Sequence, residues 1–181
     1  MITPISRRQF LRGRLAAKHR AMRPPWAVEE PAFLERCSRC GDCITACEEG
    51  VIQSDSGYPQ LVFTDSGCSF CGDCANACNT GALLNTNDST EPGWNYSASL
   101  NDEHCLAHRG VVCQVCAEQC DAGAIRFQLA AGRVPTPELS SADCTACGYC
   151  IAACPGKALS IIPFNRSNQQ EQEDTQCMSQ A

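Results

Sequence analysis

The sequence predicts an α+β fold made of two small tandem domains, and three observations carry this prediction. Cysteine accounts for 17 of the 181 residues, and sixteen of these cysteines fall into four runs of four. The first two runs belong to an internal repeat with a period of 31 residues, measured from Cys37 to Cys68. A polar stretch separates the first pair of runs from the second pair, as expected of a linker between domains.

The fourth run has the most informative spacing, C-x2-C-x2-C-x3-C-P, which ends at Pro155. This spacing is typical of bacterial [4Fe–4S] ferredoxins, in which the fourth cysteine ligates the other cluster of a pair. The run comprises Cys144, Cys147, Cys150 and Cys154. Two further runs share the spacing but lack the proline: Cys37, Cys40, Cys43 and Cys47, then Cys68, Cys71, Cys74 and Cys78. A variant run widens the first interval to seven residues: Cys105, Cys113, Cys116 and Cys120.

These runs predict four [4Fe–4S] clusters held by sixteen thiolates, in tandem bacterial-type 2[4Fe–4S] ferredoxin-like domains stapled by their clusters. Structural zinc is the weaker alternative, because its common sites use C-x2-C pairs separated by longer loops, often with histidine. A disulfide scaffold is also weaker, because such scaffolds rarely place four cysteines within eleven residues. Near the variant run, His104 and His108 are alternative ligands, proton-coupled neighbours of a cluster, or residues of the loop surface, and we favour the loop surface because four cysteines already complete the set. Cys177 is left over, and we expect a free thiol without function.

Short apolar segments follow the runs and predict the strands of both domains. In the first domain these are Val51–Ile52 and Leu61–Phe63, joined by turn residues at 54–57. In the second, we expect strands at 124–127, 133–134 and 158–162, with Pro135 and Pro137 ending the middle one. The predicted divisions are a basic arm at 1–32, domains at 33–86 and 104–163, a linker at 87–103 and a disordered tail at 164–181.

The runs can pair in two ways. Adjacent pairing makes two tandem domains, whereas nested pairing matches the first run with the fourth and the second with the third. We favour adjacent pairing because each half contains a complete strand–turn–strand unit between its two runs. Its four ligand sets are Cys37, Cys40, Cys43, Cys78; Cys68, Cys71, Cys74, Cys47; Cys105, Cys113, Cys116, Cys154; and Cys144, Cys147, Cys150, Cys120.

Charge is distributed unevenly along the chain. Residues 1–28 carry seven cations and no acid, a charge of +7. Because the whole chain has a net charge of −6, residues 29–181 carry −13. Ser6-Arg7-Arg8 resembles a twin-arginine export signal, but the four cations at 12–20 leave no apolar core for a signal peptide. We therefore expect a non-cleaved, cytoplasmic arm, with periplasmic export as the alternative. The arm is either a solvated tail or a docking segment in which Phe10, Leu11, Leu15 and Met22 share a helix face.

The sequence lacks the residues that other classes of function require. No run approaches eighteen apolar residues, so no membrane span is expected. The acidic body without aromatic–basic interleaving argues against nucleic-acid binding. No nucleophile–base pair, phosphate loop or open metal site predicts catalytic residues, so we expect an electron-transfer or maturation factor that is not an enzyme.

The chain resembles the NapF family, the ferredoxin-type accessory proteins of periplasmic nitrate reductase. The resemblance rests on Ser6-Arg7-Arg8, on Arg23-Pro24-Pro25-Trp26 and on three regular cysteine runs with the Cys105–Cys113 variant. It implies a cytoplasmic iron–sulfur protein that binds the molybdenum-containing catalytic subunit before export and assists its maturation. The alternative function is an electron-transfer subunit of a respiratory oxidoreductase complex, possibly exported through the twin-arginine pathway.

Overall fold

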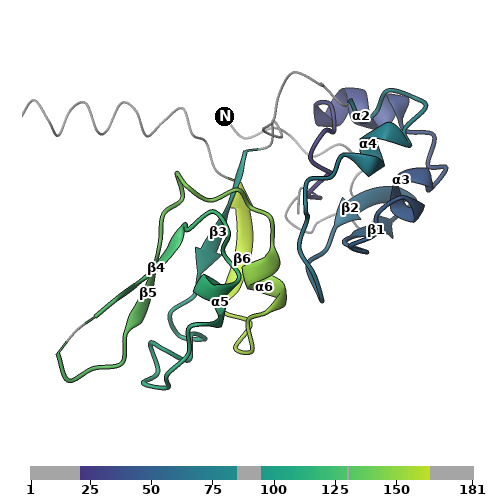
Figure 1. Cartoon of the computed structure of the whole chain (residues 1–181). Helices are drawn as coiled ribbons and strands as arrows, with labels where there is room; N and C mark the ends of the chain where they lie inside the picture. Colours follow the sequence, from purple (N-terminus) through teal and green to yellow (C-terminus); the bar gives the residue numbers. More distant parts are fainter. Residues whose placement is uncertain (1–20, 85–94, 130, 164–181) are drawn as a thin grey trace, which may run out of the picture.

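A computed structural model of the chain describes residues 21–84, 95–129 and 131–163, which gather into two lobes (Figure 1). The N-terminal lobe, residues 21–84, contains α2 (Glu30–Arg36), α3 (Asp42–Thr45), β1 (Ile52–Asp55), β2 (Tyr58–Leu61) and α4 (Asp73–Asn76). The C-terminal lobe, residues 95–129 and 131–163, contains β3 (Tyr96–Leu100), α5 (Val115–Glu118), β4 (Ile125–Gln128), β5 (Thr136–Leu139), α6 (Tyr149–Ala152) and β6 (Leu159–Pro163). None of the helices in these ranges is long and apolar enough to span a bilayer. The helix face predicted around Phe10, the tail and Cys177 lie outside the described residues.

The hairpin of the N-terminal lobe pairs β1 with β2, with Ile52 opposite Leu61. Ser56 and Gly57 connect the strands and have φ values of +52° and +87°. Two left-handed residues in succession match the twist of the flanking strands, as in a type I′ turn. The prediction of the second strand at 61–63 is wrong, because the strand begins three residues earlier and ends at Leu61. It includes Pro59, which a two-stranded sheet tolerates because each strand has a free edge.

Residues 22–28 form part of the N-terminal lobe and pack against the rest of it, although the sequence analysis places them in the basic arm. Ala27 forms a β-bridge with Leu83, and the N–H of Val28 donates to the carbonyl of Ala82 at 3.1 Å. Arg23 binds Glu30 at 2.7 Å, and its guanidinium lies 4.7 Å from the centre of the Phe33 ring. This cation therefore has a structural role that its neighbours in the sequence do not reveal.

The C-terminal lobe combines a hairpin with a long-range strand pair. β4 pairs with β5, and Ile125 lies opposite Leu139. The predicted strand at 124–127 is found, but the return strand is 136–139, not 133–134, and it contains Pro137. β3 pairs with β6 at the residues where a closing strand was expected. Residues 96–100 are thus a strand where the sequence predicts a linker, because pairing with distant residues orders a segment whose own residues give little strand signal.

A repeated apolar pair forms the centre of each lobe. It begins four residues after the last cysteine of every run, and all eight of its side chains are buried: Val51–Ile52, Ala82–Leu83, Ala124–Ile125 and Ala158–Leu159. Beyond these pairs, Phe33 is the largest fully buried side chain among the described residues. Four cysteines are buried with them, namely Cys74, Cys105, Cys144 and Cys150. The apolar interior of each lobe is therefore small, and it includes cysteine side chains as well as aliphatic ones.

Candidate metal centres

Each cysteine run folds into a loop followed by a single helical turn. In the three regular runs the residue before the second cysteine has a positive φ: Arg39 (+62°), Phe70 (+57°) and Ala146 (+58°). The glycine after that cysteine is also left-handed, with φ values between +85° and +88° at Gly41, Gly72 and Gly148. Two left-handed positions so close together curl the loop, so that its cysteines converge. The third cysteine then lies in the short helix, and the fourth follows two residues after that helix ends.

The structure brings the sixteen cysteines together in four quartets, each lining one cavity. Quartet A comprises Cys37, Cys40, Cys43 and Cys78. Quartet B comprises Cys47, Cys68, Cys71 and Cys74. Quartet C comprises Cys105, Cys113, Cys116 and Cys154. Quartet D comprises Cys120, Cys144, Cys147 and Cys150. In each quartet three cysteines come from one run and the fourth comes from the adjacent run, which is the grouping that adjacent pairing predicts.

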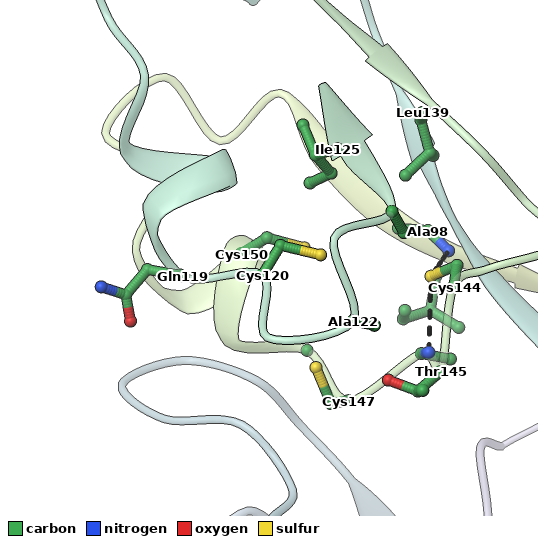
Figure 2. Close-up of a pocket in the computed structure, with 14 residues that line it drawn as sticks. Ala98, Gln119, Cys120, Ala122, Ile125, Leu139, Cys144, Thr145, Cys147 and Cys150 are labelled. Atoms are coloured by element: carbon green, nitrogen blue, oxygen red, sulfur yellow. Dashed lines mark hydrogen bonds between the residues drawn. The ribbon is translucent and has the colours of Figure 1, made fainter. Parts of the chain in front are cut away.

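Figure 2 shows how quartet D is assembled from two segments. Cys144 and Cys147 lie on the loop that leads to α6, Cys150 lies in α6, and Cys120 follows α5. The N–H groups of Ala98 and Ala146 each donate to the Sγ of Cys144 at 3.4 Å. The first of these donors belongs to β3, so the strand that the sequence assigned to the linker contributes to the surroundings of a candidate ligand.

Backbone donors also reach the fourth cysteine of two runs. The N–H of Leu83 lies 3.4 Å from the Sγ of Cys78, and the N–H of Ala158 lies 3.3 Å from that of Cys154. Burial raises the pKa of Cys78, but the donors from Leu83, Thr80 and Ala82 outweigh it and hold the pKa below its ordinary value. Such donors stabilise a thiolate and tune the reduction potential of a cluster that it ligates.

Crowding of thiols has the opposite effect on the inner cysteines. Burial, and then the neighbouring thiolates of its own quartet, raise the pKa of Cys43 to about 11. Burial, and then thiolates of the same and the neighbouring quartet, raise the pKa of Cys74 and of Cys150 to about 12. Several thiolates in one cavity repel one another and lose solvation, so they need cations among them. Iron would supply that positive charge.

The donor chemistry of the quartets fits a cluster better than a single ion. A structural zinc ion holds four ligands about 2.0–2.3 Å from one point. Within the described ranges, no three His, Cys, Asp or Glu side chains are grouped so that they hold one metal ion. Four thiolates around a cavity suit a [4Fe–4S] cube, whose four irons each take one cysteine. All sixteen of these cysteines are free thiols, available as ligands.

The other candidate residues lie at the margins of this arrangement. His104 and His108 are exposed, and the Nδ1 of His108 lies 3.5 Å from a carboxylate oxygen of Asp102. Sequence reasoning missed the contacts that Glu49, Ala146 and Tyr149 make between the lobes. No local pattern marks them, because each depends on a residue that lies more than sixty positions away.

The comparisons with known proteins agree with these centres. The family described as a 4Fe-4S dicluster domain matches twice, at residues 36–82 and 110–178. The ferredoxin-type protein NapF of Haemophilus influenzae is 38% identical over 168 residues, which cover 87% of this chain and 93% of the relative. NapF of Escherichia coli K12 is 36% identical over 155 residues, covering 85% and 92%.

A methylamine utilization ferredoxin-type protein, MauM of Paracoccus denitrificans, is more distantly similar. It is 35% identical over 152 residues, which cover 75% of this chain and 67% of the relative. The two family matches thus fall one in each lobe, and the second begins at residue 110, within the variant run.

Proposed function

Because this chain belongs to the NapF family of ferredoxin-type proteins, we propose that it is an iron–sulfur accessory protein of periplasmic nitrate reductase, without an active site of its own. It binds the catalytic subunit in the cytoplasm, before that subunit is exported, and assists its maturation. The observation that carries the proposal is the grouping of sixteen cysteines into four quartets, each around its own cavity.

In this proposal each quartet holds one [4Fe–4S] cluster, and the chain holds four. When bound, a cluster accepts or donates one electron, either to serve electron transfer or to support cluster assembly in the client. The residues of the chain provide four thiolates per site, N–H donors to several of the sulfurs, and a cover of small apolar side chains. Two domains of the 2[4Fe–4S] type in tandem, one per lobe, are the simplest arrangement consistent with these quartets.

Iron analysis tests the cluster content. Anaerobically purified protein should contain about sixteen iron and sixteen sulfide ions per chain, because four clusters contain four of each. Cys71→Ser removes one thiolate of quartet B, so we expect a loss of about four irons. Cys177→Ser is the matched control, because Cys177 belongs to no run, and it should retain the full content. Bound zinc without sulfide would overturn the proposal.

Co-purification tests the partner. Residues 1–28 carry +7 and the remainder of the chain is acidic, so the basic segment is our candidate for client docking. We expect the chain to capture the unexported catalytic subunit from a cytoplasmic fraction. Replacing Arg7, Arg8, Arg12 and Arg14 by Gln should reduce the captured amount, because it removes four positive charges. Replacing Arg126 and Arg133 of the C-terminal lobe by Gln is the control. An equal reduction of the captured amount in that variant would contradict docking through the basic segment.

The second candidate function is an exported electron-transfer subunit of a respiratory complex. Ser6-Arg7-Arg8 favours it, because the twin-arginine pathway reads such a motif. The two candidates differ in where the protein is found and in its N-terminus. Intact protein with Met1 or Ile2 in the cytoplasm supports the maturation factor, whereas shortened protein recovered from the periplasm supports the exported subunit.

A further inference from the structure

The two lobes meet through glycines that leave room for the opposite lobe. At Gly148 in the C-terminal lobe, an ideal Cβ would lie 2.3 Å from the Cγ and Cδ1 atoms of Phe63. At Gly67 in the N-terminal lobe, it would lie 2.5 Å from the Cγ and 2.6 Å from the backbone N of Tyr149. Neither position has space for even a methyl group. An aromatic side chain of each lobe therefore covers a glycine of the other, and we call this contact the interlock.

Polar contacts fix the interlock in register. The N–H of Cys68 donates to the carbonyl of Cys147 at 2.7 Å. The hydroxyl of Tyr149 donates to Oε1 of Glu49 at 3.0 Å, while that of Ser66 donates to Oε2 at 2.6 Å. Ala146 is only 2% exposed, because it inserts into the apolar cluster of the N-terminal lobe. The contact therefore combines packing with hydrogen bonds that require one relative placement of the lobes.

The general fold of a cysteine run does not require this contact. Gly41 occupies the same register in the first run as Gly148 does in the fourth, and the two have φ values of +87° and +88°. A Cβ at Gly41 would meet no atom within 4 Å, whereas one at Gly148 would overlap Phe63. The difference between these glycines therefore isolates the interlock from the needs of the loop itself.

The interlock joins two quartets directly. Cys68 belongs to quartet B and Cys147 to quartet D. From one Sγ to the other, the path crosses covalent bonds of two cysteines and a single backbone hydrogen bond. Within each lobe the quartets also adjoin, because α3 packs against α4 and α5 against α6, and each of these helices carries one cysteine. The quartets thus follow one another in the order A, B, D, C.

We propose that Gly67, Gly148 and Tyr149 are positioning residues that hold Cys68 against Cys147, so that electrons pass between the lobes through quartets B and D. The inference rests on the proposed function, because it requires a cluster in each quartet. One electron crosses the junction at a time, so that one centre is oxidised by one unit as the other is reduced by one, with no transfer of atoms or protons. The four sites then form one series, and quartets A and C are its ends.

The test compares Gly148→Ala with Gly41→Ala in the full chain, loaded with clusters. Both replacements introduce alanine at a left-handed position with nearly the same φ, so both incur the same backbone strain. Only Gly148→Ala places a methyl group against Phe63. A second variant, Gly67→Ala, lies at a position without a positive φ, and it should separate the lobes without that strain.

Two measurements follow the lobes and the electrons. Hydrogen–deuterium exchange at the Cys68 amide reports whether its bond to Cys147 persists. Electron paramagnetic resonance of dithionite-reduced protein reports magnetic interaction between neighbouring reduced clusters, and the interactions within each lobe are common to all variants. We expect faster exchange and loss of part of the interaction signal in Gly148→Ala and Gly67→Ala. Gly41→Ala should match the wild type in both measurements.

The outcomes are distinct from those of the proposed function. Wild-type protein without iron and sulfide would overturn the proposed function itself. If the wild type is loaded, but Gly148→Ala and Gly67→Ala retain their iron, amide protection and interaction signal, only the junction is overturned. The same holds if Gly41→Ala changes the signals as much as Gly148→Ala does, or if exchange increases while the magnetic interaction remains intact.

Discussion

At the scale of single residues, the surroundings of each sulfur differ although the runs repeat. Two residues after the fourth cysteine the four runs have Glu49, Thr80, Ala122 and Gly156. Among these four residues, only Thr80 carries a hydroxyl group, and its Oγ1 lies 3.6 Å from the Sγ of Cys78. A thiolate accepts hydrogen bonds but has none to donate, so Thr80 is the donor when Cys78 is a ligand. Quartet A therefore has a side-chain donor at a position where the other quartets have none of this kind.

We predict that Thr80→Val lowers the reduction potential of one cluster and leaves the others unchanged. A hydrogen bond to a ligand sulfur favours the reduced, more negative cluster, so its loss disfavours reduction. A net bond of about 0.5–1.5 kcal/mol corresponds to a shift of roughly 20–65 mV for one electron. A redox titration monitored by electron paramagnetic resonance measures the shift. Thr64→Val, at an exposed residue outside the quartets, is the control, and an equal shift there would contradict the assignment.

At the scale of secondary structure, the cysteine runs were predictable and the strands only partly so. The spacing within a run determines which three thiols converge, whereas the fourth thiol of each quartet depends on which runs pair. Strand ends depend on partners instead. Proline signals predicted a return strand that ends before Pro135, yet β5 begins after Pro135 and contains Pro137, because it pairs only with β4 and has a free edge. β3 has little signal of its own and is ordered by β6, some sixty residues away.

The β1–β2 turn provides a test of the hairpin. Ser56 has a φ of +52°, a conformation that asparagine adopts more readily than serine. We predict that Ser56→Asn stabilises the cluster-loaded protein by about 0.5 kcal/mol, measured as a higher urea midpoint. Gly57→Ala should lower the midpoint, because φ is +87° there and the Cδ of Arg39 lies 3.0 Å from the added Cβ position. Equal midpoints for the two variants would contradict the type I′ turn.

At the scale of the whole molecule, clusters and core are interdependent. The buried apolar side chains of each lobe are few, and several of the groups that they surround are cysteines. Domains with so little apolar interior usually depend on metals or disulfides to fold. Electrostatics adds to this dependence on metal. Burial and neighbouring thiolates raise the pKa of the inner cysteines, so these thiols lose their protons less readily in cluster-free protein.

We predict that cluster removal unfolds most of the chain. Treating the loaded protein with a chelator and an oxidant should abolish its near-UV circular dichroism and make both lobes sensitive to protease. Chain treated in parallel without chelator is the control. Native-like dichroism together with protease resistance in cluster-free protein would show that the apolar contacts suffice by themselves.

The relative placement of the lobes was beyond prediction from this sequence. Gly41, Gly72 and Gly148 have the same register, and the sequence offers the same explanation for all three, namely a loop that approaches a cluster. The structure separates them, because Gly148 faces Phe63 of the other lobe and Gly41 faces open space. Such a distinction depends on residues 85 positions apart, and no local spacing encodes it.

The exchange of one cysteine between adjacent runs also determines the order in which the quartets become complete during translation. As the ribosome extends the chain, quartet B has all its cysteines once Cys74 is made, and quartet A once Cys78 follows. Quartets D and C are completed only at Cys150 and Cys154, more than seventy residues later. The N-terminal lobe can therefore receive its iron while translation of the C-terminal lobe is still in progress.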